Sequence, residues 1–377
     1  MSEIIVKAVE NEVEKMRFIK FPWEIYKGYD NWVPPLIYDV RKNLDTVKNP
    51  FYKHAKIQLF LALDGKTIVG RIAAIVNDNH NKKYNDKVGF FGYFESINSK
   101  EVSIALFEAA GNWLKENGMD TIRGPINLSI NDEVGLLAEG YDTPPVLLMT
   151  YNPPYYEKLI TDYGFTKAKE LYAYIFGEQH FDSNTKSLEK LQRVSDIVIK
   201  RDNIKIRKIV LKNLESELMK VMKVYNSAWI DNWGSVQMTE EEFKFVASSL
   251  KPLVDEDIVY FAEVNGEPVG FSLSLPDYNQ IFRHINGKLL PFGWYKILTG
   301  RKKINAIRVM IMGIVPEYQR KGIEAVFINN TIKIGTSKGY KNAEISWVLE
   351  DNVPMVQTAI NLGAEKYKTY RIYDKQI

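Results

Sequence analysis

The stretch Gly313-Ile314-Val315-Pro316-Glu317-Tyr318-Gln319-Arg320-Lys321-Gly322-Ile323 decides the fold of this chain. Its apolar first residues predict the end of a buried strand, Pro316 predicts a turn, and the residues after Gly322 predict a helix. The first N–H groups of a helix lack partners within it and lie at the positive end of its dipole, so they can bind an anion. Gly322 lets a ligand approach the backbone closely, and Arg320 and Lys321 add positive charge. The same residues also fit an ordinary strand–turn–helix with a solvated basic turn.

The composition is that of a folded chain with a sizeable core. Of 377 residues, 45% are hydrophobic and 26% are charged, and this length predicts about two or three domains. The net charge is only +3, from 50 basic and 47 acidic residues, which argues against nucleic acid as a partner. There is no cysteine, and the histidines are scattered at 54, 80, 180 and 284. We therefore expect no disulfide, no thiolate chemistry and no metal site.

No targeting or membrane-spanning signal is evident in the sequence. Residues 1–7 lack a basic segment followed by a long apolar run, so they do not resemble a signal peptide. No window approaches the roughly 18 uninterrupted apolar residues of a transmembrane helix. We expect a cytoplasmic protein with no integral membrane segment, and peripheral contact with a membrane stays open.

The second half of the chain repeats the order of the elements predicted in the first half. Both halves have an early strand, a hairpin around an Asp-Gly or Asn-Gly turn, a further strand followed by a helix, and a late helix and strand. The first half has them at 4–9, 11–19, 57–63, 68–76, 88–94, 101–117, 121–123, 153–163 and 168–176. The second half has them at 204–210, 214–229, 239–250, 258–264, 269–275, 306–315, 322–335, 343–349, 354–362 and 365–373. We expect an N-terminal domain over 1–180, a connector over 181–203 and a C-terminal domain over 204–377.

The C-terminal half resembles the GNAT superfamily of acyl-CoA-dependent N-acyltransferases. The family signature follows a strand and consists of Gln or Arg, two residues, Gly, one residue, and Gly or Ala. Here the strand 309–314 and Val315-Pro316 lead to Gln319 and Gly322, and Gly363-Ala364 is similar to the Gly-Phe that follows the family's fourth helix. The N-terminal half resembles the same fold. The resemblance implies an α/β (α+β) chain of two tandem GNAT-like domains, each a mixed, largely antiparallel sheet flanked by helices, as in a group of large bacterial tandem-GNAT proteins.

This resemblance also implies a site for acetyl-CoA or another acyl-CoA as cosubstrate. The CoA pyrophosphate would lie at the backbone N–H groups of 320–323, and pantetheine would run along 312–315. Asn352 stands where the family places an Asn near pantetheine. The implied cofactor-binding residues are Met312, Gly313, Ile314, Val315, Gln319, Arg320, Lys321, Gly322, Ile323 and Asn352.

Three departures from the family pattern concern catalysis. Glu324 replaces the final Gly or Ala of the signature, no tyrosine lies near Ala359, and the strand 307–315 has no carboxylate. An active enzyme would need other acids and bases, and the candidates by position are Glu344, Glu350, Tyr370 and Tyr373, although a structural role explains each of them more simply. The alternative is a CoA- or ligand-binding module that has lost catalysis. A third class, the tandem-GNAT peptidoglycan transferases that use aminoacyl-tRNA, is disfavoured by the near-neutral charge.

An acceptor pocket is suggested by the residues after the helix at 214–229. Asn226, Trp229 and Trp233 would share one face of a continuing helix, with Asn232 beside them, giving an aromatic wall with amide donors. Asp277 follows a strand end, and a carboxylate there could orient an ammonium group and accept its proton. The acceptor would be a small-molecule or lipid amine. A core face that stops at Gly234 explains the same pattern.

In the N-terminal half, the counterpart of the phosphate turn is the stretch 95–101. It contains no glycine and two acids, so we expect it to bind no CoA. The polar loop 124–133 is either a place for acceptor contacts or a plain surface connection.

Overall fold

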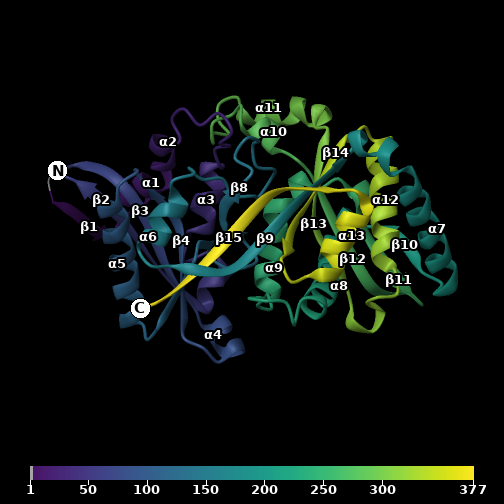
Figure 1. Ribbon diagram of the computed structural model, residues 1–377, viewed down its shortest axis with the longest axis horizontal. Coiled ribbons are helices and arrows are strands. Elements are labelled where there is room, and N and C mark those ends of the chain that lie inside the picture. Colours follow the sequence, from purple (N-terminus) through teal and green to yellow (C-terminus); the bar gives the residue numbers. More distant parts are fainter. Residues whose placement is uncertain (1–2) are drawn as a thin grey trace. The chain divides into compact units, whose positions relative to one another are not determined.

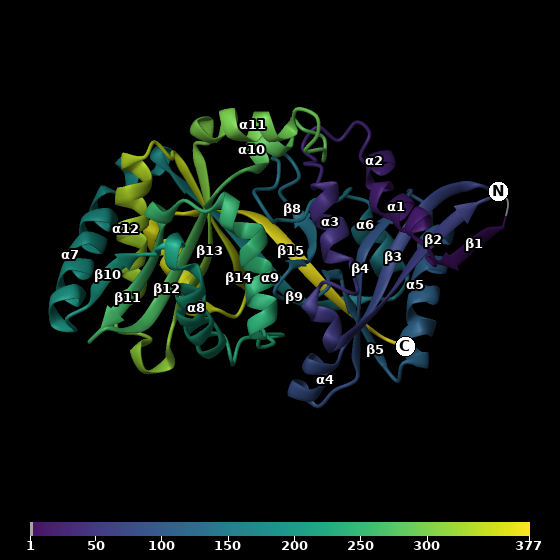
Figure 2. The same ribbon diagram turned by 180° about the vertical axis from the view of Figure 1, so that it is seen from behind.

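The computed structural model describes residues 3–377, which form two compact units (Figures 1 and 2). The N-terminal unit comprises Met1–Leu171, Phe282–Lys296 and Lys368–Ile377, and the C-terminal unit comprises Tyr172–Ile281 and Ile297–Tyr367. These units differ from the expected domains in that 282–296 and 368–377, from the second half of the sequence, belong to the N-terminal unit. Residues 172–180 in turn belong to the C-terminal unit.

The sheet of the N-terminal unit runs β1-β2-β3-β4-β5-β15, and within it only β4 and β5 are parallel. Its strands are β1 (Ile4–Ala8), β2 (Ala55–Asp64), β3 (Thr67–Asn77), β4 (Val88–Ser96), β5 (Thr121–Gly124), the part of β15 (Glu365–Gln376) from Lys368 onward, and β8 (Leu136–Glu139), which pairs with β15. A separate two-stranded sheet joins β6 (Ile126–Asn127) to β7 (Glu133–Val134). The helices are α1 (Glu12–Lys20), α2 (Pro22–Ile25), α3 (Ile37–Asn43), α4 (Asp78–Tyr84), α5 (Lys100–Glu116) and α6 (Tyr156–Asp162).

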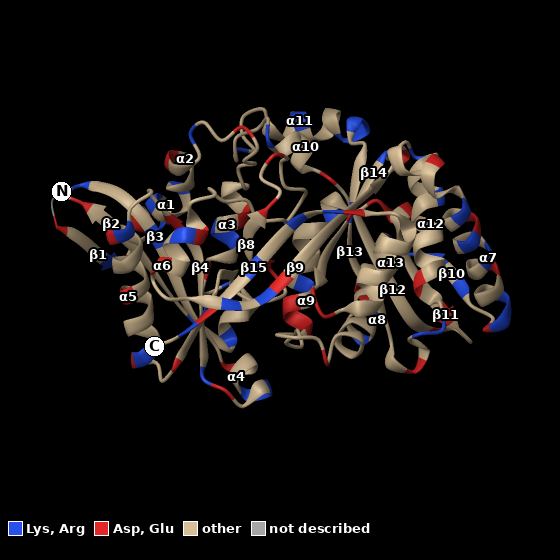
Figure 3. Cartoon of the chain, viewed as in Figure 1, with Lys and Arg blue, Asp and Glu red and all other residues tan. Residues whose placement is uncertain are grey.

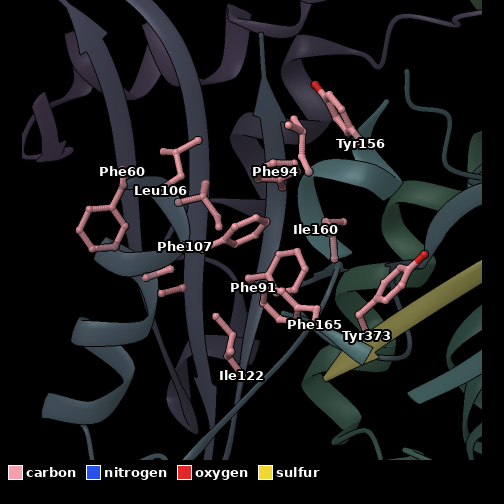
Figure 4. Packing of buried hydrophobic residues seen from close by; sticks show 14 of the residues in the cluster. Phe60, Phe91, Phe94, Leu106, Phe107, Ile122, Tyr156, Ile160, Phe165 and Tyr373 are labelled. Carbon is pink, nitrogen blue, oxygen red and sulfur yellow. The ribbon is translucent and has the colours of Figure 1, made fainter. Parts of the chain in front are cut away.

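Helix α5 packs its apolar face on the N-terminal sheet and forms the core of this unit. Val102, Leu106, Phe107, Ala110 and Leu114 are buried and recur at helical spacing. They join aromatic residues of β4 and of the segment after α6, as Figure 4 shows for Phe91, Phe94, Phe107 and Phe165. Glycines in the sheet make room for the leucines: a Cβ at Gly70 would lie 2.7 Å from Leu106 Cδ1, and one at Gly89 would lie 2.4 Å from Leu114 Cδ2.

Two long strands pass from one unit into the other. Strand β15 begins in the C-terminal unit, and its end pairs antiparallel with β5, from Tyr373↔Gly124 to Gln376↔Thr121. Arg123 on β5 donates two hydrogen bonds, of 2.7 and 2.6 Å, to the carboxylate of Asp374, which fixes this pairing. Strand β9 (Thr166–Gly177) passes from the first unit to the second. Each of these two strands therefore contributes residues to both units.

The C-terminal unit repeats the plan of the first, as the sequence predicted. Its strands run β14-β13-β12-β11-β10, and only β13 and β14 are parallel. They are β10 (Lys205–Lys208), β11 (Val259–Val264), β12 (Glu267–Pro276), β13 (Ala306–Ile314) and β14 (Asn342–Leu349). The helices are α7 (Thr185–Arg201), α8 (Leu214–Ala228), α9 (Glu240–Leu250), α10 (Asn279–Phe282), α12 (Ile323–Ser337) and α13 (Val353–Leu362). Helix α11 (Gly293–Gly300) begins in the N-terminal unit, which includes 293–296, and ends in the C-terminal unit.

Helices cover both faces of β12 and β13. A Cβ at Gly270 would lie 3.0 Å from the Phe327 ring of α12, whereas one at Gly313 would lie 2.2 Å from the ring of Trp229, which follows α8. Gly313 pairs with Phe271, the residue after Gly270, so the two glycines face opposite sides of the sheet. Helix α12 thus lies on one face and the end of α8 on the other.

Candidate active site

The parallel pair β13–β14 opens before either strand ends. Cα partners run only from Ala306↔Asn342 to Val309↔Ile345, although β13 continues to Ile314 and β14 to Leu349. Within the described part of the chain, residues 310–314 of β13 have no partner strand on the side of β14, whereas 311–314 stay paired with β12 on the other side. Backbone N–H and C=O groups at such an edge can pair with an extended ligand.

A β-bulge lies where the pair opens. Along β12, Leu273 pairs with Ile311 and the next residue, Ser274, pairs with Val309, so Met310 has no partner on that strand. The extra residue of a bulge is left out of the ladder and re-aims the groups around it. The bulge and the open edge therefore present backbone groups of β13 at the same place.

A buried polar chain lies beside this opening. Arg308 on β13 stands directly opposite Glu344 on β14, and both are almost fully buried, with 2% and 1% of their surface exposed. Arg308 Nε donates to Ser346 Oγ at 3.0 Å, and Ser346 Oγ donates to Glu344 Oε1. Tyr367 OH donates to the other oxygen, Glu344 Oε2. The Arg308 guanidinium also lies 5.0 Å from the centre of the Trp347 ring. Glu344, one of the predicted catalytic residues, is therefore a buried carboxylate with hydroxyl and guanidinium neighbours.

The turn before α12 keeps the form that the sequence predicted. Gln319 Nε2 donates to Ile314 O at 3.0 Å, and Arg320 adopts a positive φ of 59°. Gly322, with φ of 90°, is the N-cap of α12 and supplies no side-chain cap. Within the part of the chain that the structure describes, the N–H groups of 321–323 donate to no backbone acceptor. They are available to an anion, as the implied CoA site requires.

Helix α7 supports this turn and gives Gly322 a second role. Arg201 donates to Lys321 O at 2.8 Å, and a Cβ at Gly322 would lie 2.9 Å from Val198 Cγ2. Gly322 is therefore needed here for two structural reasons, its positive φ and the close packing of α7. Close approach of a phosphate would be a third reason. Glu324 is half-buried, and its Oε2 has no hydrogen-bond partner in the described chain.

The structure brings Trp229 against β13 but does not continue α8 to Trp233. Helix α8 ends at Ala228 and Trp229 is its C-cap, so the expected helical face shared by Trp229 and Trp233 is wrong. The chain leaves the helix there because the amide of Asn226 binds the next segment, with Asn226 Nδ2 donating to Met238 O at 3.1 Å and Oδ1 accepting from Met238 N at 3.3 Å. Asn232 and Trp233 lie in that segment, both half-buried. The Trp229 ring stacks on Tyr225, with 4.8 Å between ring centres.

The structure places the remaining predicted residues as follows. Asp277 is 6% exposed, and its Oδ1 accepts from Asn279 N at 3.2 Å at the start of α10. Asn352 caps α13, since its Oδ1 accepts from Met355 N at 3.3 Å. Glu350 is half-buried in the turn after β14. Tyr370 is fully buried on β15 in the N-terminal unit, opposite Leu137 of β8.

Sequence reasoning missed Arg308, Ser346 and Tyr367. A signal for Arg308 was present, because it is the single charge in the otherwise apolar strand 306–314. An arginine on a buried strand needs a partner, and Glu344 stands at the matching position of the next strand.

In the N-terminal unit, the chain itself fills the corresponding opening. Strand β4 pairs with β5 only up to Phe90↔Arg123, and beyond this Tyr93 N donates to Asn127 Oδ1 at 2.7 Å. A Cβ at Gly92 would lie 2.2 Å from the carbonyl oxygen of Ile126. Ser99 caps α5 and accepts from Val102 N, so one helix-start N–H is already used. These contacts give a physical reason for the prediction that this half binds no CoA.

Comparison with known proteins identifies the family. The chain is 35% identical over 386 aligned residues to the bacterial ceramide synthase of Caulobacter vibrioides, with 100% of this chain and 98% of that protein covered. It is 36% identical over 380 residues to protein YghO of Escherichia coli K12, covering 99% and 95%. The chain belongs to the family of these two proteins. No protein-family model matches the sequence.

Solved structures show the fold. A tandem GNAT protein from the clavulanic acid biosynthesis pathway superposes with a TM-score of 0.59 at 10% identity, covering 99% of this chain and 98% of that one. A GCN5-related N-acetyltransferase from Sphaerobacter thermophilus gives 0.52 at 9% identity, covering 99% and 95%. The expected tandem GNAT fold is confirmed. The alternative of a module without catalysis is not favoured.

Across 3–377, no three His, Cys, Asp or Glu side chains gather as a metal site would require. None of the helices described there is both long and apolar enough to cross a bilayer.

Proposed function

We propose that this chain transfers a long acyl group from acyl-CoA to the primary amine of a sphingoid-type lipid base, forming a ceramide-like amide. The observation that carries this proposal is the open end of the β13–β14 pair, where an unpaired strand edge, a bulge at Met310 and the buried Glu344 meet. The lipid acceptor is supported by the whole-length likeness to a bacterial ceramide synthase, since a ceramide is the N-acyl derivative of such a base.

Acyl-CoA would bind along β13 and across the start of α12. The free N–H groups of 321–323 and the side chains of Arg320 and Lys321 suit the pyrophosphate. The unpaired edge of 310–314 suits the amide groups of pantetheine, which would pair with it as an added strand. Gly313 allows the Trp229 ring to lie directly on this strand, so the ring supplies one apolar wall.

In the proposed reaction, the neutral amine attacks the thioester carbonyl carbon. The new C–N bond forms, the C–S bond breaks and CoA leaves as its thiolate, while the nitrogen gives up a proton. We propose that Glu344 receives that proton through the hydroxyl of Ser346, to which it is hydrogen-bonded. Arg308 holds Ser346 in place, and a backbone N–H at the Met310 bulge would polarise the carbonyl. A relay is needed because Glu344 itself is only 1% exposed.

The residues predicted for the acceptor pocket also have roles in the proposed reaction. Asp277 could orient the ammonium group of the acceptor before it loses its proton, and Asn226, Asn232 and Trp233 would shape the acceptor side. The amide of Asn226 already holds Met238, so its contribution would be indirect.

A thiol-release assay tests the proposal. Because the chain contains no cysteine, a thiol reagent would report only the CoA set free. Acyl-CoA donors from acetyl to palmitoyl would be combined with sphinganine, with a simple alkylamine or with an amino acid. We expect release to require sphinganine and to rise with acyl length. Faster release with the amino acid than with sphinganine, or none with any donor, would overturn the proposal.

A further inference from the structure

The connection between β12 and β13, residues 277–305, exposes a group of large apolar side chains. The exposed fractions are 75% for Leu290, 71% for Phe292, 50% for Trp294, 56% for Tyr295 and 67% for Leu298. A soluble surface normally scatters such residues singly, so five of them within nine positions mark a contact surface. We call these five residues the apolar ridge.

The ridge belongs to an ordered element. Residues 293–300 form α11, and Trp294 and Leu298 are four apart, so they share one face with Tyr295 beside them. Trp294 Nε1 donates to Pro291 O at 2.9 Å, which holds the tryptophan against the preceding turn. Lys296 lies on the opposite side of the helix and donates to His284 O at 2.9 Å. The apolar face of this short helix is therefore turned outward.

The start of the connection is anchored to the N-terminal unit. Gly287 lies against Trp23, since a Cβ there would be 2.5 Å from its ring, and Gly287 O accepts from Ile37 N at 3.0 Å. Trp23 Nε1 donates to Asn286 Oδ1 at 2.6 Å. Phe282 and Ile285 are buried. The connection thus buries its first apolar residues and leaves those of the ridge uncovered.

The charged side chains that follow Asp277 in the sequence have one sign as far as Pro316. From 278 to 316 the sequence contains no Asp or Glu, and six of the basic residues there fall between 283 and 303. These six residues are Arg283, Lys288, Lys296, Arg301, Lys302 and Lys303, and Figure 3 shows basic residues at the ends of α11. The side chains of Lys288, Lys302 and Lys303 are exposed and make no hydrogen bond or ion pair within the described chain. In a chain of net charge +3, this is a local concentration of positive charge.

We propose that the apolar ridge and its basic residues bind the surface of a bilayer that contains anionic lipids. Exposed Trp, Tyr, Phe and Leu next to Lys and Arg are the composition of segments that lie in the membrane interface. The aromatic rings would enter the headgroup region, and the amines would face lipid phosphates. A partner surface of protein would offer no general reason for the absence of acids over the 28 positions 278–305 that precede strand β13.

Vesicle flotation of the full chain tests this inference without any enzyme assay. Vesicles would contain equal parts of phosphatidylcholine and phosphatidylglycerol, and a parallel set would contain phosphatidylcholine alone. We expect the protein to float with the anionic vesicles, and added salt should weaken the binding. Failure to bind anionic vesicles would overturn the inference, and would leave the proposed acyl transfer untouched because that is measured with dispersed substrates.

Two variants separate the apolar and the charged contribution. Phe292→Ser with Leu298→Ser should weaken vesicle binding on the order of a hundredfold, because two largely exposed apolar side chains lose their burial in lipid. Lys302→Gln with Lys303→Gln should weaken it roughly 25-fold, at about fivefold for each charge. The changed side chains are exposed, so the melting temperature should stay unchanged.

Matched controls lie elsewhere on the surface. Val47 is 92% exposed, and Lys186 and Lys190 are exposed on α7. Val47→Ser and the pair Lys186→Gln with Lys190→Gln should leave vesicle binding as in the wild type. Equal losses in ridge and control variants would refute the assignment. A wild-type dimer that the Phe292→Ser and Leu298→Ser variant converts to a monomer would also refute it, because the ridge would then join two copies of the chain.

Discussion

Replacing Gly322 by alanine tests how α7 supports the turn before α12. Gly322 has φ of 90°, so alanine there should cost about 1–2 kcal/mol in backbone strain. Its Cβ would also lie 2.9 Å from Val198 Cγ2, which should add roughly 1 kcal/mol of overpacking. Gly339 is the matched control, because its φ is 85° and a Cβ there meets nothing within 4 Å. Gly339→Ala should therefore cost the strain alone.

The assay is chemical denaturation of the full chain. Unfolding free energies are compared between variants whose dependence on denaturant concentration, the m-value, is the same. Gly322→Ala should destabilise the protein by roughly 1 kcal/mol more than Gly339→Ala. In a Val198→Ala background this excess should disappear, since the clashing methyl group is gone. An excess that persists in that background, or equal costs at both glycines in the wild type, would refute the packing explanation.

The double variant Gly322→Ala with Val198→Ala tests phosphate binding more cleanly than a bulky residue at 322 does. A valine there would displace α7 whether or not CoA binds. In the Val198→Ala background, Gly322→Ala should fold and yet bind CoA at least about tenfold more weakly, if the N–H groups of 321–323 hold the pyrophosphate.

Three further predictions concern other parts of the chain. Glu344→Gln should lower kcat by about 10²–10⁴, whereas Glu350→Gln should leave it near wild type, as steady-state kinetics would show. Burial lowers the pKa of His80 to about 4, although Asp86 Oδ2 lies 3.5 Å from its Nε2. The unfolded chain, with a histidine pKa of about 6.5, therefore binds the proton first, so stability should fall by up to about 3 kcal/mol between about pH 6.5 and 4. His80→Phe should flatten that fall in denaturation curves. Asn127→Ala removes the acceptor that fills the opening in the N-terminal unit and should cost about 1–2 kcal/mol without changing acyl transfer; a loss of activity at unchanged stability would contradict this.

Much of the fold was predictable because it depends on the preferences of residues that are close together in the sequence. The strand–turn–helix at 313–323 and the hairpins follow from short-range preferences of Pro, Gly and Asn, and Thr239 with Glu242 forms a capping box at the start of α9. The end of α8 was not predictable in this way, because it depends on Asn226 binding Met238, a contact between segments 12 residues apart. The end of β15 likewise depends on β5, which lies about 250 positions earlier in the chain.

The candidate site was predictable in part, for a related reason. The turn residues 319–322 and the acid Glu344 are visible in the sequence, but the partners of Glu344 are not. Arg308 and Ser346 meet it through the register of β13 and β14, and Tyr367 reaches it from β15. Register between distant strands is set by the packing of the whole sheet, which no single stretch of sequence encodes.

The central claim is that the open end of the β13–β14 pair joins an acyl chain to a lipid amine. The most direct measurement is mass spectrometry of a reaction containing a long-chain acyl-CoA, isotopically labelled in its acyl group, and sphinganine. We predict one labelled N-acyl product for each CoA thiol released by the wild type, and neither product nor thiol above background with Glu344→Gln. Release of CoA without labelled amide, or full product formation by Glu344→Gln, would contradict the account.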